Sequence, residues 1–446
     1  MAPFPFHIKE HSVPAQHIRE FPQTTSHSQE DVLYISVKQY IPIDNPNPQP
    51  GDITILGAHA NGFPKELYEP LWADLHARAH SPTNQNGFRI RSIWIADVSN
   101  QGYSGVLNEH TLGNDPSWHD HARDLLHLTN VFRTSMPRPI IGIGHSFGGA
   151  ILTKLSLLHP RLLTTIVLLD PTITTFSLKR NGPGKSVARA SAFRREVWPS
   201  RAVAEESFRR SAFYRTWDPR VLDAWVKHAV RDTPTAIYPQ SNQATLRTTK
   251  HHEVFTFFRP LWPYVYADPQ TGNINVDKDG APDFDPEAQE KLTTTKIADP
   301  DKPGTGTFPF YRSEGPSILK QLPEVRPSVL WVFGGESDLG SPAETRDFKT
   351  RSCGSGGGGS GGLAAGRVGE VVMEGRGHLF PMEVPDECAR HAVTWINKEM
   401  KRWREKEREY EEWVKLPQRE KTTLSSQFLD HVGRPPPRKI ISGSKL

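Results

Sequence analysis

The sequence predicts an α/β fold in which a mostly parallel central sheet is flanked by helices and carries an inserted lid. Short apolar runs of strand length alternate with stretches of helical periodicity, which is typical of such a sheet. This alternation stops between about residues 172 and 321 and then resumes, which indicates an insertion between two halves of one sheet. At 446 residues and 36% hydrophobic content, the chain has enough apolar material for a large core.

The expected elements follow in chain order. We expect strands at 32–41, 53–56, 90–96, 139–144, 164–169, 329–333 and 368–373. We expect helices at 120–132, 150–158 and 386–400. The mixed-charge stretch 401–415 extends the last helix until Pro417 stops it.

These elements divide the chain into regions. The core is expected to comprise 1–171 and 322–400, and the lid 172–321, which is rich in Arg, Trp, Phe and Pro. Residues 354–362 are almost all Gly and Ser, which predicts a flexible loop. Residues 401–446 are expected to form a charged helix and a flexible tail.

Composition excludes several classes of function. The net charge is only +4 and no basic stripe is interleaved with aromatic residues, so nucleic acid is not an expected partner. The two cysteines, Cys353 and Cys388, form neither a disulfide framework nor a metal-type spacing. We therefore expect no metal and no cofactor. The N-terminus lacks the pattern of a secretory signal, and no apolar run approaches the ~20 residues of a membrane span.

A candidate nucleophile lies at the end of the predicted strand 139–144. Gly144-His145-Ser146-Phe147-Gly148 matches Gly-x-Ser-x-Gly and precedes the predicted helix from Ala150. A strand-turn-helix setting is what a nucleophile elbow requires, because the serine occupies a strained turn that neighbouring backbone approaches closely. The pattern predicts Ser146 as the nucleophile.

A serine hydroxyl needs a base that is oriented by an acid. His378 follows the last predicted strand and precedes the last helix, which predicts it as the base. Asp338, shortly after the strand 329–333, is the expected orienting acid. Glu336 and Asp170, which directly follows the strand 164–169, are the alternatives.

An oxyanion intermediate needs preorganised N–H donors. The amide of Phe147 is one expected donor, because it directly follows the nucleophile. The second should come from the loop after the strand 53–56, which reads His59-Ala60-Asn61-Gly62-Phe63-Pro64. Either Asn61 or Phe63 supplies it.

Together these motifs resemble the α/β-hydrolase superfamily over roughly residues 30 to 400. The stretch 59–70, HANGFPKELYEP, is similar to a signature of fungal peroxisomal hydrolases, including host-selective toxin biosynthesis hydrolases and a yeast peroxisomal lipase. Trp118-His119-Asp120-His121-Ala122-Arg123-Asp124-Leu125, the elbow and the last three residues agree with this resemblance. The glycine tract and the long tail after Trp395 depart from the compact family pattern.

The expected function is hydrolysis of a lipophilic ester or acyl thioester through an acyl-enzyme, with the aromatic-rich insertion as an apolar lid. The resemblance implies a lipophilic acyl substrate, with a place in fungal secondary-metabolite or toxin biosynthesis. An acyltransferase would use the same triad, and a non-catalytic ligand-binding homologue is a third possibility. Relatives with a carboxylate nucleophile are disfavoured, because the elbow carries serine.

The final residues Ser444-Lys445-Leu446 match a peroxisomal address. They follow a polar stretch with three consecutive prolines, Pro435 to Pro437, which would leave them accessible. We therefore expect a peroxisomal location and an import receptor as partner.

Overall fold

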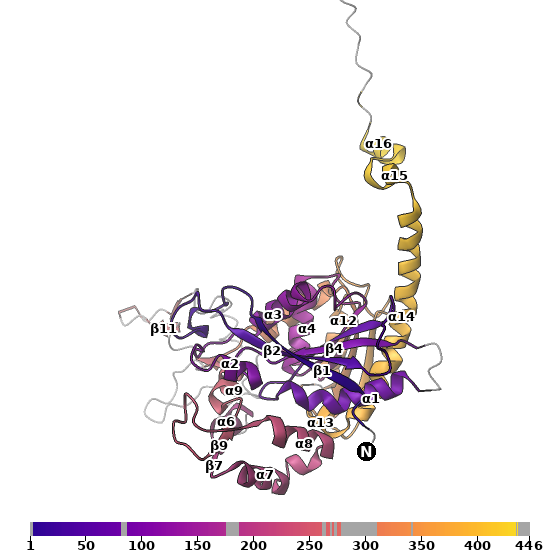
Figure 1. Ribbon diagram of the computed structural model, residues 1–446. Helices are drawn as coiled ribbons and strands as arrows, with labels where there is room; N and C mark the ends of the chain where they lie inside the picture. Colours follow the sequence, from indigo (N-terminus) through magenta and orange to yellow (C-terminus); the bar gives the residue numbers. More distant parts are fainter. Residues whose placement is uncertain are drawn as a thin grey trace, which may run out of the picture. The chain divides into compact units, whose positions relative to one another are not determined.

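The computed structural model describes residues 3–433 other than 82–86, 175–186, 261–264, 268–269, 272–273, 278–309 and 340–341, together with Pro435. The chain divides into two units, 1–399 and 400–446. The first unit holds the central sheet and the lid (Figure 1).

The core of the first unit is an eight-stranded sheet with the order β1-β2-β4-β3-β5-β6-β14-β15. The two pairs made by β2 are antiparallel, and the other neighbours are parallel. This confirms the predicted mostly parallel sheet. The strands are β1 (Phe6–Pro14), β2 (Tyr34–Pro42), β3 (Ile53–Ala58), β4 (Ile90–Ala96), β5 (Ile140–His145), β6 (Thr165–Leu169), β14 (Ser328–Gly334) and β15 (Val368–Met373).

Every strand that the sequence predicts is present within a few residues of its expected bounds, but β1 was not expected. Only Phe6 and Val13 of this edge strand are buried, and its other residues are exposed or half-buried. With one paired side and few buried positions, β1 carries no apolar run or alternation that would reveal it.

Helices cover both faces of the sheet, with α1 (Glu69–Ala79) on one face and α3 (Trp118–Val131) and α4 (Phe147–Leu158) on the other (Figure 1). The Ser117 hydroxyl caps α3 by accepting a hydrogen bond from the amide of His119. Helix α14 (Pro385–Lys415) confirms the expected extension of the last core helix. The remaining helices outside the lid are α2 (Gly102–Leu107), α12 (Ala343–Ser352), α13 (Phe380–Glu383), α15 (Gln418–Thr422) and α16 (Ser426–Val432).

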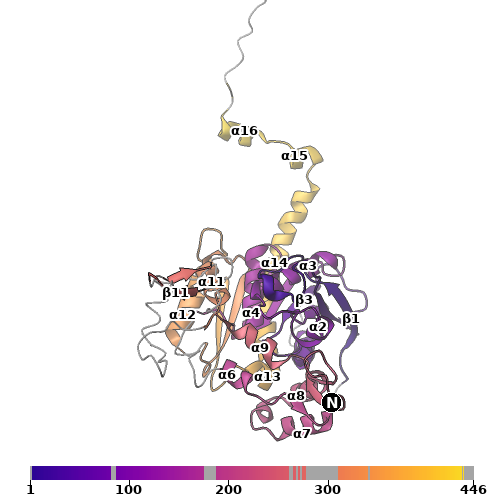
Figure 2. The same cartoon turned by 90° about the vertical axis from the view of Figure 1, so that its left-hand side faces the viewer.

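The insertion leaves the sheet after β6 and returns at β14, which is the neighbour of β6 (Figure 2). Its buried aromatic side chains, Trp198, Phe208, Trp217 and Trp225, give it a small apolar centre of its own. Its last helix packs Ile318 into the main core. The elements of the insertion are α6 (Val187–Ala192), β7 (Val197–Trp198), α7 (Arg201–Arg210), α8 (Pro219–His228), β8 (Val230–Asp232), β9 (Ala244–Leu246), α9 (Lys250–Phe257), β10 (Arg259–Pro260), β11 (Val265–Ala267), β12 (Ile274–Val276), β13 (Phe310–Tyr311) and α11 (Glu314–Gln321).

The glycine-rich tract 354–362 forms turns that bond to the segment before β14. The amide of Gly356 donates to the carbonyl of Pro323 at 2.8 Å, and the amide of Ser360 donates to Val325 at 3.1 Å. The predicted domain boundaries, and the flexibility of this tract, stay predictions. In the part of the chain that the structure describes, no helix is both long and apolar enough to cross a membrane.

Candidate active site

Ser146 occupies a sharp turn between β5 and α4, with φ 56° and ψ −118°. The turn is tight because the end of β3 lies directly against it. A Cβ atom on Gly148 would lie 2.2 Å from the carbonyl oxygen of Ala58, so only glycine fits there. The sequence therefore builds the elbow that the Gly-x-Ser-x-Gly pattern predicts, and it brings the loop after β3 next to Ser146.

His378 reaches Ser146 from the loop after β15. Its Nε2 atom lies 2.8 Å from the Ser146 hydroxyl, which is also 3.1 Å from the hydroxyl of Thr172. The loop passes close to the end of β14, where a Cβ on Gly334 would lie 2.7 Å from the carbonyl oxygen of Gly377. The predicted nucleophile and base thus form a direct hydrogen bond.

The carboxylate that contacts His378 is Asp170 and not Asp338, so the expected position of the acid was wrong. The Oδ2 atom of Asp170 lies 2.6 Å from Nδ1 of His378. Asp338 and the alternative Glu336 are both exposed. Asp170, one of the two alternatives that the sequence offered, is therefore the carboxylate that contacts His378.

Strand register explains this outcome. His145 at the end of β5 pairs with Leu169 at the end of β6, so Ser146 and Asp170 follow at the same level of the sheet. Asp338 lies four residues beyond the end of β14, after a turn in which the Ser337 amide donates to the carbonyl of Gly334. That turn directs the Ser337 hydroxyl to Asp170, and the next side chain is exposed.

Asp170 is fully buried and accepts several hydrogen bonds. Burial alone would raise the pKa of its carboxyl group, but the hydrogen bond and charge of His378, with donors from Ser337 and the Gly334 amide, lower that pKa. The carboxylate is therefore held ionised beside Nδ1 of the histidine.

The amides of the loop 59–64 differ in whether they already have an acceptor. The amide of Gly62 donates to Gln101 Oε1 at 2.7 Å, and that of Phe63 donates to the Ala60 carbonyl at 3.2 Å. Among the described residues, the Asn61 amide has no acceptor. The Phe147 amide is in the first turn of α4, where amides have no acceptor within the helix.

The side chain of Asn61 joins this loop to the lid. Its Nδ2 atom donates to the carbonyl of Glu253 in α9 at 3.0 Å, and its Oδ1 atom accepts from Gln101 at 2.8 Å. The ring of Phe63 makes edge contacts with Trp217 and Trp225 of the lid, at centroid distances of 5.4 and 6.0 Å. The lid therefore contacts the loop that lies against the elbow.

A second chain of hydrogen bonds, which sequence reasoning missed, runs behind the site. The Ala60 amide donates to the Tyr68 hydroxyl at 2.8 Å, which lies 2.9 Å from Nδ1 of His145. The Nε2 atom of His145 lies 3.1 Å from the carbonyl oxygen of His378. Burial lowers the pKa of His145 to about 3, so its ring is neutral and carries one donor and one acceptor.

These contacts fix the direction of each hydrogen bond. A carbonyl only accepts, so Nε2 of His145 donates to His378 and Nδ1 accepts from Tyr68. The only sequence signal for this arrangement was a histidine in the variable position of the elbow motif.

The predicted address Ser444-Lys445-Leu446 lies outside the described residues.

Comparison with known families matches residues 55–391 to the alpha/beta hydrolase family. Among curated relatives, a type I acyl-CoA thioesterase of Penicillium brevicompactum, mpaH', is 43% identical over 425 residues, which cover 91% of each chain. An abhydrolase domain-containing protein of Alternaria alternata, AFT2-1, is 29% identical over 59% of this chain and 85% of its own length.

Among solved structures, the peroxisomal α/β-hydrolase Lpx1 of Saccharomyces cerevisiae superposes with a TM-score of 0.62 at 17% identity. The match covers 89% of this chain and 90% of that chain. At this identity the likeness supports the fold. These findings agree with the resemblance that the sequence motifs carry.

Proposed function

Because the chain belongs to the α/β-hydrolase family and is an ester or thioester hydrolase, we propose that it is an acyl-CoA thioesterase that acts through Ser146, His378 and Asp170. The observation that carries the proposal is the unbroken path of hydrogen bonds. Ser146 lies 2.8 Å from one ring nitrogen of His378, and Asp170 lies 2.6 Å from the other.

The first half of the reaction forms an acyl-enzyme. The Ser146 oxygen attacks the thioester carbonyl while Nε2 of His378 removes its proton. The amides of Phe147 and Asn61 donate to the negative oxygen of the tetrahedral intermediate. The carbon–sulfur bond then breaks, and the imidazolium returns its proton to the departing thiolate of coenzyme A.

The second half releases the acid. A water molecule loses a proton to His378 and attacks the ester carbonyl of the acyl-enzyme, and the proton then returns to Ser146. Asp170 holds Nδ1–H of the histidine in place and stabilises the imidazolium in both halves. Its buried, ionised carboxylate suits this role.

The substrate class is supported by the relatives. Three proteins from Penicillium, each a type I acyl-CoA thioesterase, are 40% to 43% identical over 91% of this chain. The proposed place is fungal secondary metabolism, which the resemblance of the stretch 59–70 to host-selective toxin biosynthesis hydrolases implies. The aromatic side chains of the lid that contact Phe63 fit a lipophilic acyl group.

The test is a panel of acyl-CoA thioesters and matched oxygen esters of increasing chain length, assayed with purified full-length protein. We expect release of free coenzyme A and acid, and covalent labelling by a fluorophosphonate. Ser146→Ala should lower kcat by at least about a thousandfold and abolish the label, because the nucleophile is gone.

A folded Ser146→Ala protein with near-normal turnover would contradict the proposed nucleophile. Product analysis with added alcohols and amines separates hydrolysis from acyl transfer. A predominance of acyl transfer to these acceptors would contradict the thioesterase assignment and leave Ser146 as the nucleophile.

We also propose import into peroxisomes, which the residues Ser444-Lys445-Leu446 support. A fluorescent protein fused to the N-terminus of this chain should give a punctate signal that coincides with a peroxisomal marker. Deletion of the three residues should make the signal diffuse and leave thioesterase activity unchanged. Identical distributions of the two fusions would refute the address.

A further inference from the structure

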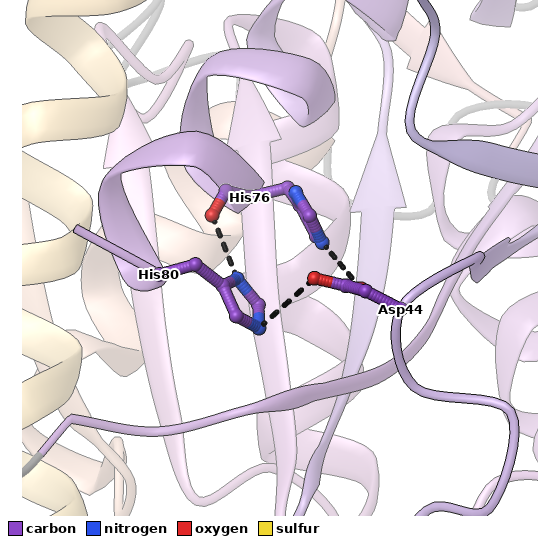
Figure 3. A group of neighbouring side chains, drawn as sticks. All are labelled: Asp44, His76 and His80. Atoms are coloured by element: carbon purple, nitrogen blue, oxygen red, sulfur yellow. Dashed lines mark hydrogen bonds and ion pairs between the residues drawn. The ribbon is translucent and has the colours of Figure 1, made fainter.

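Away from the site described above, two histidines and one aspartate converge on the last turn of α1. His76 and His80 lie four residues apart, so they project from the same side of this turn. Asp44 comes from the connection between β2 and β3, and one ligand-type atom from each of the three residues lies within 4.8 Å of the others. Figure 3 shows both imidazole rings presenting a nitrogen to the Asp44 carboxylate.

The contacts of His80 leave a gap that a cation would fill. Its Nδ1 atom lies 2.9 Å from the carbonyl oxygen of His76, so Nδ1 carries the hydrogen. In a neutral ring the lone pair is then on Nε2, which faces the Asp44 carboxylate at 3.7 Å. Two acceptors that face each other at this distance form no direct hydrogen bond, and a metal ion or a proton between them would join them.

His76 is the second candidate ligand. Its Nε2 atom donates a hydrogen bond of 2.9 Å to the other carboxylate oxygen of Asp44, and a metal ion would take the place of that hydrogen. Its ring packs edge-on against Phe6 at 5.3 Å.

The surroundings hold the carboxylate in place and favour a positive charge. The next residue, Asn45, is buried and donates to the Asp52 side chain and to the carbonyl of Ile90, which fixes the turn that carries Asp44. Arg89 donates to the backbone carbonyl of Asp44 at 3.1 Å and so adds a second restraint on this turn. The carboxyl end of a helix attracts cations, and both histidines lie at that end of α1.

We propose that Asp44, His76 and His80 bind a divalent transition metal ion of the zinc type. Two imidazole nitrogens and one carboxylate oxygen are ligands that Zn²⁺ prefers, with water completing the coordination. The hydrogen bond from His80 Nδ1 to a carbonyl is the kind of outer contact that orients metal-bound histidines. The ion would tie the β2–β3 connection to the end of α1. No metal site was predicted from the sequence, because Asp44 meets the two histidines only in the folded chain.

The experiment is calorimetric titration of Zn²⁺ into full-length protein stripped of metal by a chelator. We expect a single saturable site at this cluster, with visible absorption bands of tetrahedral type when Co²⁺ is used instead. Asp44→Asn and His80→Gln should each weaken binding by at least about tenfold. Both residues are at the surface, so neither change removes core packing. His7→Gln, which removes an exposed histidine from β1, is the matched control and should bind as the wild type does.

The unfolding temperature is a second measurement, and it distinguishes a variant that has lost the metal site from one that has not folded. Zn²⁺ should raise the unfolding temperature of the wild type and of His7→Gln, but not of the two cluster variants, because a ligand stabilises only a fold that binds it. No saturable uptake by the wild type, or uptake that both cluster variants retain, would overturn the proposal. In that case a proton joins His80 to Asp44, and the cluster is an ion pair.

Discussion

Ser146 and Asp170 share an uncommon backbone conformation. Both have positive φ, 56° and 45°, and both directly follow adjacent strands, β5 and β6. A non-glycine residue in such a conformation costs about 1–3 kcal/mol, and the surrounding fold must impose it. Here the strain turns two side chains toward the same histidine. The level of the sheet that carries the proposed nucleophile therefore also carries the proposed acid.

The identity of the acid is testable by substitution. We expect Asp170→Asn to lower kcat by about a thousandfold or more, because an amide neither selects the correct histidine tautomer nor stabilises the imidazolium. Asp338→Asn and Glu336→Gln should stay within about threefold of the wild type, since both side chains are exposed. Steady-state kinetics on one acyl-CoA substrate compares all three.

If Asp338→Asn were the most damaging of the three, the geometry around His378 would be misassigned. Circular dichroism and unfolding curves of each variant provide the control for folding. The comparison is meaningful because each change removes a charge and keeps the shape of the side chain.

At the scale of elements, three segments converge behind the triad. The loop after β3 contributes Ala60, the short helix Lys65–Tyr68 contributes Tyr68, and the end of β5 contributes His145, which bonds to the backbone of the His378 loop. The loop that offers the Asn61 amide and the loop that carries the base are therefore joined by buried, directional hydrogen bonds. Displacing either loop by about 1 Å would be costly for catalysis.

Tyr68→Phe tests this connection. The change keeps the ring and leaves the Ala60 amide and His145 Nδ1 without their partner, so both loops lose a positional constraint. We expect kcat to fall about tenfold with KM changed less than about twofold, because alignment is lost and substrate contacts are kept. Stopped-flow acylation and steady-state kinetics measure the two effects.

Tyr40→Phe is the matched control for Tyr68→Phe. Tyr40 is equally buried and its hydroxyl donates to Glu69, away from the triad. Both changes should lower the free energy of unfolding by about 1–3 kcal/mol. A loss of kcat that is equal in the two variants would show a general loss of stability and no specific link to the site.

At the scale of the whole molecule, the strands and loops that the sequence predicts correctly are those that depend on a local pattern of residues. Strands such as β4 and β15 were located because they are apolar runs of strand length, and Ser146 and His378 were located because their loops follow such strands. The choice between Asp170 and Asp338 depended on which strand lies beside β5, and strand order is not a local property. The contacts of Tyr68 and Asp44 were missed for the same reason, since their partners are distant in the chain.

Buried neutral histidines make the stability of the whole fold depend on pH. Burial lowers the pKa of His59 to about 4 and that of His145 to about 3, whereas an unfolded histidine titrates near 6.5. Nε2 of His59 accepts from the Val98 amide at 3.0 Å, a bond that a protonated ring would lose. Between pH 6.5 and about 4 the unfolded chain therefore binds more protons than the folded chain, so stability falls as the pH falls.

Unfolding by urea at pH 7.5 and pH 5.0 measures this dependence. Each of the two histidines should contribute about 2 kcal/mol of lost stability at pH 5.0. Asp120 acts in the opposite direction, because burial raises its pKa to about 6 and the folded state then binds the extra proton. That gain is about 1 kcal/mol. It is smaller than the combined loss from the buried histidines, which also include His228 and His252 with pKa values lowered by burial to about 4, so we expect a net loss of stability at pH 5.0. His59→Gln should flatten the dependence by about 2 kcal/mol, and the exposed His7→Gln should leave it unchanged. A fold that is as stable at pH 5.0 as at pH 7.5 would mean that these two histidines are not buried in the neutral form.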